Sequence, residues 1–146
     1  GMRTIGVDPS PESQAAATDL GVTVVDLDQL LSESDVISVN CPLNIATHHL
    51  IDTSAFAKMK PGAFLVNTGR GPVVETDALA KALASGSLGG AAVDVLEIEP
   101  TPLDSPLRIF DNVIFGSHNA SNTLEASART HDIAIAHLIK EVRALG

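Results

Sequence analysis

The stretch that decides the fold runs from Ala63 to Gly71 and reads Ala-Phe-Leu-Val-Asn-Thr-Gly-Arg-Gly. Four apolar residues in a row, preceded by Pro61-Gly62, indicate a short strand buried on both faces. The Gly-Arg-Gly turn behind this strand predicts a binding loop, because ligands of open parallel sheets lie beyond the carboxyl ends of the strands. Arg70 between two glycines is suited to bind a carboxylate, although an arginine in an ordinary surface turn fits the same residues equally well.

The composition limits the class of protein. Of 146 residues, 45% are hydrophobic and only four are aromatic, so we expect a globular core of aliphatic side chains. The net charge of −9 comes without a basic cluster, which argues against a nucleic-acid or anionic-membrane partner. The single cysteine excludes an internal disulfide, and no apolar run is long enough to span a membrane. No signal-peptide pattern opens the chain, so we expect a cytoplasmic protein.

Strand and helix patterns alternate along the chain. The expected strands are 3–7, 22–25, 35–39, 63–66, 90–95 and 112–115, and the expected helices are 11–20, 26–34, 54–59, 76–84 and 121–145. Ser10 is the expected N-cap of the first helix and Gly21 its stop. This alternation predicts a single α/β domain, in which a parallel sheet carries helices on both faces.

Residues that can bind or react stand directly after these strands. In chain order they are Asp8, Asn40-Cys41-Pro42, Thr68-Gly69-Arg70-Gly71, Asp94 with Glu97 and Glu99, and His118. Because the carboxyl ends of parallel strands share one edge of the sheet, we expect a cation, carboxylates and an imidazole to meet there.

The chemistry of these side chains indicates their roles. Arg70 can hold a carboxylate in a bidentate fork, and His118 can exchange a proton near neutral pH while Glu99 fixes its tautomer. Asp8 can bind a ribose diol and repel a 2′-phosphate, which favours NAD over NADP. Plainer interpretations stay open, with Asp8 as a turn former before proline. Likewise, Glu97, Glu99 and His118 fit an ordinary solvated loop.

The remaining histidines and the cysteine show no metal or nucleophile pattern. His131 and His137 are six residues apart and do not share a helix face, so we expect them, like His48 and His49, to be structural or exposed. No metal site is predicted. Cys41 has no lysine or arginine beside it in sequence, which favours a small apolar contact over a nucleophile.

In combination, these motifs resemble the NAD-binding domain of D-isomer-specific 2-hydroxyacid dehydrogenases, most closely the phosphoglycerate dehydrogenase branch. The similar segments are residues 5–9, 41–43, 47, 50–51, 59–63, 66–71, 90–95, 99–100, 112–114 and 118. The resemblance implies a Rossmann-type fold and NAD as the cofactor. It also implies hydride transfer to or from a small D-2-hydroxy acid or 2-keto acid, with 3-phosphoglycerate as one candidate, and a homo-oligomer.

The resemblance also assigns residues. Arg70, Glu99 and His118 match the catalytic arginine, glutamate and histidine of the family. The first would orient the substrate, the last would be the acid/base, and Glu99 would pair with its imidazole. The positions that match cofactor-binding residues are Asp8, Cys41, Pro42, Thr68, Gly69, Arg70, Asp94, His118, Ala120 and Ser121.

One departure from the family pattern is large. The G-x-G-x-x-G loop, the strand before it and the substrate domain have no counterpart in this sequence. We therefore expect residues 1–146 to form a partial NAD-binding domain that lacks the central first strand, as a fragment or as a chain completed by another copy or another polypeptide. The alternative function is a non-catalytic assembly module that does not bind NAD alone.

Overall fold

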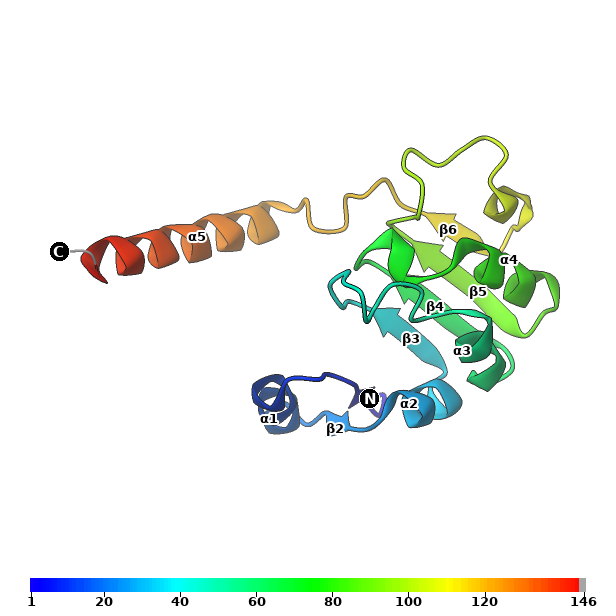
Figure 1. The fold of residues 1–146 in the computed structure, drawn as a ribbon, viewed down its shortest axis with the longest axis horizontal. Coiled ribbons are helices and arrows are strands. Elements are labelled where there is room, and N and C mark those ends of the chain that lie inside the picture. The colour runs from blue at the N-terminus through cyan, green and yellow to red at the C-terminus, as the bar shows by residue number, and fades with distance from the viewer. Residues whose placement is uncertain (145–146) are drawn as a thin grey trace.

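The computed structural model describes residues 1–144, which form short parallel strands and helices (Figure 1). The strands are β1 (Ile5–Gly6), β2 (Thr23–Val24), β3 (Val36–Val39), β4 (Ala63–Asn67), β5 (Leu88–Val93) and β6 (Val113–Phe115). The helices are α1 (Pro11–Asp19), α2 (Leu27–Glu33), α3 (Thr53–Lys58), α4 (Thr76–Ala84) and α5 (Leu124–Ala144), with 3₁₀ turns at Gly71–Val73 and Pro106–Ile109. The expected α/β class is confirmed.

The strands form two separate parallel sheets. β1 pairs with β2, and the four-stranded sheet has the order β3-β4-β5-β6. Within residues 1–144 no strand lies between β1 and β3, so each of these two strands has one unpaired edge. The division falls where the family resemblance places the absent first strand.

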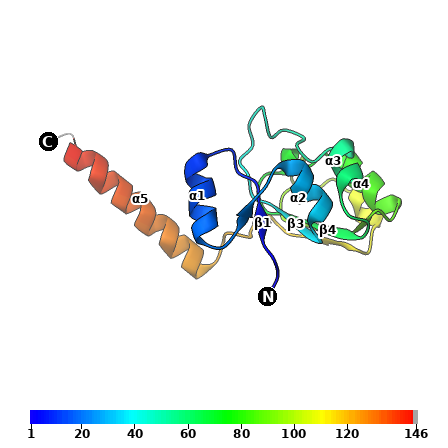
Figure 2. The ribbon, with the colours of Figure 1, turned by 90° about the horizontal axis from the view of Figure 1, so that it is seen from below.

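The core lies on one face of the four-stranded sheet. Ile37 and Val39 of β3 and Leu65 of β4 are between 0% and 6% exposed. They form one cluster with Leu31 of α2, Phe56 of α3 and further residues of α4. Figure 2 shows these three helices on the same side of the strands. This layer fixes the strand ends from which the candidate site is built.

The opposite face of the sheet is open in the part of the chain that the structure describes. Phe64 of β4 is 50% exposed and Ile114 of β6 is 72% exposed. The expectation that β4 is buried on both faces is therefore wrong, and helices α2 to α4 cover the face that carries the core. Helix α5, the longest of the described helices, extends away from the sheet and has no buried residue (Figures 1 and 2).

Capping side chains explain where the helices begin. Ser10 caps α1 as predicted. α5 begins at Leu124 and not at Ser121, because Thr123 Oγ1 accepts the N–H of Ala126 at 3.1 Å and caps the helix there. The predicted end of this helix, residue 145, lies outside the described residues. None of the helices within residues 1–144 has the length and apolar character needed to cross a membrane.

Candidate functional site

The loop after β4 is built around the side chain of Asn67, which is 1% exposed. Asn67 Oδ1 accepts the N–H of Gly69 at 3.1 Å, and Nδ2 donates to the carbonyl oxygen of Arg70 at 3.2 Å. The Arg70 guanidinium lies at the surface and donates to the Gly69 carbonyl at 2.7 Å. It forms no ion pair with a residue in the range 1–144, so its charge is available to an anionic ligand.

A hollow of about 550 Å³ lies beside this loop. Its walls come from the ends of β3 and β4 and consist of Asn40, Cys41, Pro42, Leu43, Thr68, Gly69 and Arg70. A Cβ on Gly69 would lie 3.1 Å from the Cys41 carbonyl oxygen, so the two loops approach closely because this residue is glycine. Burial raises the pKa of the Cys41 thiol, in keeping with a neutral contact and not a thiolate nucleophile.

Glu99 and His118 form a hydrogen-bonded pair beyond β5 and β6. His118 Nδ1 lies 2.7 Å from Glu99 Oε2, and Glu99 Oε1 accepts the N–H of Leu96 at 2.9 Å. The bond from the His118 ring and then the bond from Leu96 lower the pKa of Glu99. His118 has a left-handed backbone with φ 55°, a strained conformation of the kind that concentrates at functional sites.

Asp94 holds the backbone of the loop that carries His118. Its Oδ1 accepts the N–H of Asn119 at 3.0 Å, and its Oδ2 accepts the N–H of Ala120 at 2.8 Å. These two bonds, in that order, lower the pKa of Asp94. The Asp94 carbonyl also accepts the N–H of His118 at 2.9 Å. The contacts of Asp94, Ala120 and Ser121 with a cofactor remain predictions.

The Arg70 loop and the Glu99 loop touch through Gly71 and Leu96. Gly71 is buried, and a Cβ placed on it would overlap the carbonyl oxygen and carbon of Leu96. Because Leu96 in turn donates to Glu99, this contact sets the Arg70 loop against the Glu99–His118 pair.

Asp8 follows β1, a strand of the two-stranded sheet, and not a strand of the sheet that carries the other groups. Its Oδ1 accepts the N–H of Ser10 at 2.8 Å, which is the turn-forming role that the sequence left open. The carboxylate is exposed, so this bond is compatible with a second contact to a ribose. The ribose contact itself remains a prediction.

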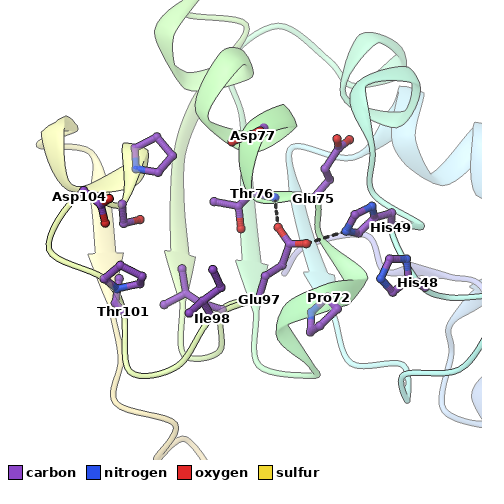
Figure 3. A pocket seen from close by; sticks show the side chains of 14 residues that line it. His48, His49, Pro72, Glu75, Thr76, Asp77, Glu97, Ile98, Thr101 and Asp104 are labelled. Carbon is purple, nitrogen blue, oxygen red and sulfur yellow. Dashed lines mark hydrogen bonds and ion pairs between the residues drawn. The ribbon is translucent and has the colours of Figure 1, made fainter.

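A second carboxylate–histidine pair was not anticipated from the sequence. Glu97 Oε1 lies 2.6 Å from His49 Nε2, and Glu97 Oε2 accepts the N–H of Thr76 at 2.6 Å (Figure 3). These residues line another cavity, of about 580 Å³. Among residues 1–144 no group of three or more metal-ligating side chains lies close enough together to hold an ion.

Comparison with known proteins decides the family. Residues 1–120 match the family model described as "D-isomer specific 2-hydroxyacid dehydrogenase, NAD binding domain". The chain belongs to this family. The match spans both sheets and the loops that carry Arg70, Glu99 and His118.

Two curated relatives with a large matched share of this chain are named as reductases. The glyoxylate reductase of Thermofilum pendens is 51% identical over 114 residues, which cover 78% of this chain and 34% of the relative. The hydroxypyruvate reductase of Thermotoga maritima is 40% identical, with 97% of this chain and 46% of the relative covered. The chain thus spans between a third and a half of the length of these two relatives.

Solved structures of the family share the fold. The D-lactate dehydrogenase of Aquifex aeolicus, complexed with NAD and lactic acid, has a TM-score of 0.79 and 33% identity, with 99% of this chain and 47% of that chain covered. A family member from Xanthobacter autotrophicus Py2, in complex with NADPH and MES, has a TM-score of 0.84, 33% identity, and coverages of 99% and 58%. The Rossmann-type fold and NAD as the cofactor of the family are therefore confirmed.

The residues present fit part of a 2-hydroxyacid dehydrogenase cofactor site. Asp8 offers an exposed carboxylate beyond β1, and the hollow beside Arg70 has Gly69 where a Cβ would lie only 3.1 Å from the Cys41 carbonyl oxygen. The described helices begin at residues 11, 27, 53, 76 and 124, and none of them follows a glycine-rich loop of the kind that binds a pyrophosphate.

Proposed function

We propose that this chain forms the larger part of the NAD-binding domain of an enzyme that interconverts a small D-2-hydroxy acid and its 2-oxo acid. The observation that supports this most is the Glu99–His118 pair, which lies beyond the same edge of the sheet as the Arg70 guanidinium, for which residues 1–144 supply no ion-pair partner. A bound nicotinamide supplies or accepts the hydride. The chain's own residues bind the acid, orient it and move a proton.

The roles follow from the chemistry of the three side chains. Arg70 binds the carboxylate of the acid in a fork and turns its carbonyl towards the nicotinamide. His118 donates a proton from Nε2 to the carbonyl oxygen during reduction and accepts it during oxidation. Glu99 Oε2 lies 2.7 Å from His118 Nδ1, and this bond keeps the other ring nitrogen, Nε2, directed at the substrate.

The substrate that we favour is a 2-oxo acid with a short side chain. Two relatives are named for glyoxylate and hydroxypyruvate, and a solved neighbour contains lactic acid. None of the relatives and neighbours described above is named for 3-phosphoglycerate, so the preference for that acid gains no support.

We further propose that a strand and a glycine-rich loop outside this sequence complete the sheet between β1 and β3. The unpaired edges of these two strands and the open face beside them support this proposal. The helix N-terminus that follows such a loop would bind the pyrophosphate. By itself, the chain would then be an assembly module with weak affinity for NAD or none.

A titration with NADH tests both parts of this proposal. We expect weak binding or none by the chain alone, and clear binding by a polypeptide that also contains the strand and the glycine-rich loop. Asp8→Arg should weaken that binding because it removes the acceptor for the ribose, whereas Asp19→Arg, an equal charge change on exposed surface, should not. Equal binding by both variants would contradict the role of Asp8.

A further inference from the structure

Glu97 is bonded to two other parts of the chain, the loop at His49 and the start of α4 at Thr76. Its Oε1 is 2.6 Å from His49 Nε2 and its Oε2 is 2.6 Å from the backbone nitrogen of Thr76 (Figure 3). The side chains of Glu97 and His49 are 24% and 35% exposed, so both are partly shielded from water. Partial burial raises the pKa of Glu97, but the bonds from Thr76 and His49 outweigh this effect, and the pKa is lowered.

Both donors to Glu97 belong to rigid parts of the molecule. The backbone N–H of His49 donates to the carbonyl oxygen of Pro72 at 2.8 Å, and Ile51 forms a β-bridge to Val74. Thr76 is the first residue of α4, whose buried side chains pack into the core. Glu97 is therefore bonded both to the loop at His49 and to the first residue of α4.

The segment that carries Glu97 has no regular structure of its own. β5 ends at Val93, and the next element of the described chain begins at Pro106. Ile98 is 65% exposed, and Glu99 is also exposed. Near its start this segment is held by the buried side chain of Val95, by the approach of Leu96 to Gly71 and by the two bonds of Glu97.

We propose that Glu97 is a positioning residue, which His49 and Thr76 hold in place so that Glu99, two residues further on, meets His118. The consequence for catalysis rests on the proposed function, whereas the positioning of Glu99 by Glu97 does not. Removing the hydrogen bonds to Glu97 should therefore weaken the hydrogen bond between Glu99 and His118, although both of these residues are still present.

Two substitutions remove the hydrogen bonds to the Glu97 carboxylate and leave Glu97 itself unchanged. Thr76→Pro removes the donating N–H at the first position of a helix, where proline is favoured. Glu75 before it has ψ 117°, the extended conformation that a following proline requires. His49→Asn removes the ring donor, and asparagine tolerates the backbone φ of 52°. Glu75→Gln is the matched control, because it removes a carboxylate that lines the same cavity and has no side-chain hydrogen bond within residues 1–144.

The test is an NMR titration of the Glu99 carboxyl carbon in the 146-residue chain, together with the nitrogen chemical shift of His118 Nδ1. In Glu97→Ala and in the combined His49→Asn/Thr76→Pro variant, the pKa of Glu99 should rise towards its ordinary value. The Nδ1 signal should move towards that of an unbonded ring, and Glu75→Gln should match the parent chain. Circular dichroism verifies that each variant is folded, and the combined variant decides the outcome if Glu97→Ala unfolds. A parent-like titration of Glu99 in the folded combined variant would overturn the proposal.

The activity of a completed polypeptide, which contains the missing strand, the glycine-rich loop and a substrate domain in addition to this chain, separates this inference from the proposed function. For a 2-oxo acid reduced with NADH, the combined variant should lower kcat on the order of 10- to 100-fold, because a small misplacement of a reacting group is costly. The KM for NADH should stay unchanged. An altered Glu99 titration in a completed polypeptide that turns over no 2-oxo acid would overturn the proposed function and leave the link from Glu97 to Glu99 intact.

Discussion

His118 Nδ1 lies 2.7 Å from Glu99 Oε2, although the two residues are 19 positions apart in the sequence and follow different strands. The bond leaves Nε2 as the ring nitrogen that can exchange a proton with a ligand. The lowered pKa of Glu99 favours the ionised carboxylate, which accepts a hydrogen bond from the ring.

Replacing Glu99 by glutamine tests this relationship. The amide keeps the shape of the side chain but loses the charge that stabilises a protonated imidazole. We expect kcat to fall on the order of 10²- to 10⁴-fold in the completed polypeptide, in steady-state assays that follow NADH. Glu125→Gln, on the exposed surface of α5, is the control. Glu99 would have no role if both variants turned over at the parent rate.

Acid should destabilise the chain partly through Asp94. The pKa of Asp94 is lower in the folded chain because Asn119 and Ala120 donate to its carboxylate, so the unfolded chain binds more protons in this range. The stabilisation is thus present above the ordinary carboxyl pKa of about 4 and is lost as the pH falls through the folded value. Urea unfolding at a series of pH values should show a shallower pH dependence for Asp94→Asn. An unchanged dependence would argue against these two hydrogen bonds.

Gly71→Ala should be more damaging than Gly69→Ala. A Cβ at residue 71 overlaps the backbone of Leu96, whereas a Cβ at residue 69 has its nearest neighbour, the Cys41 carbonyl oxygen, at 3.1 Å. We expect Gly71→Ala to lower the free energy of unfolding by about 1–3 kcal/mol, with a smaller loss for Gly69→Ala. Chemical denaturation of both variants measures the order. A reversed order would contradict the close contact between the Arg70 and Glu99 loops.

Asn67→Ala should destabilise the Arg70 loop, because the Asn67 side chain bonds to two backbone groups of that loop. It leaves the N–H of Gly69 and the carbonyl of Arg70 without their buried partner, at a cost of about 1–3 kcal/mol. Asn122→Ala, at an exposed position, should change stability by less than about 0.5 kcal/mol. Thermal unfolding compares the two variants, and equal stability would mean that the Asn67 amide does not hold the loop.

The parts of the site that the sequence could predict depend on local order. Because the chain alternates strand and helix, the residues after the strands of one parallel sheet were expected at one edge, and Glu99 and His118, which follow β5 and β6, do meet there. Ser10 was recognisable as a cap from its place before Pro11. These inferences needed only periodicity and turn residues.

The remaining features depend on contacts between distant residues. Phe64 and Leu65 are both apolar, so the pattern could not show that one faces the core and the other an open face. His49 and Glu97 are 48 positions apart, and His49 has a left-handed backbone that no neighbouring glycine signals. The start of α5 was misplaced because Ser121 and Thr123 are both residues that cap helices, and the sequence pattern does not distinguish them; in the structure Thr123 is the cap.

The central claim is tested most directly by the NADH-dependent reduction of glyoxylate and hydroxypyruvate, with the completed polypeptide and its Arg70→Ala and His118→Ala variants. The account predicts turnover by the parent and a loss of kcat/KM on the order of 10² or more in each variant. Arg129→Ala, on the exposed surface of α5, should match the parent. No turnover by the parent, or parent-like kcat/KM in either site variant, would contradict the account.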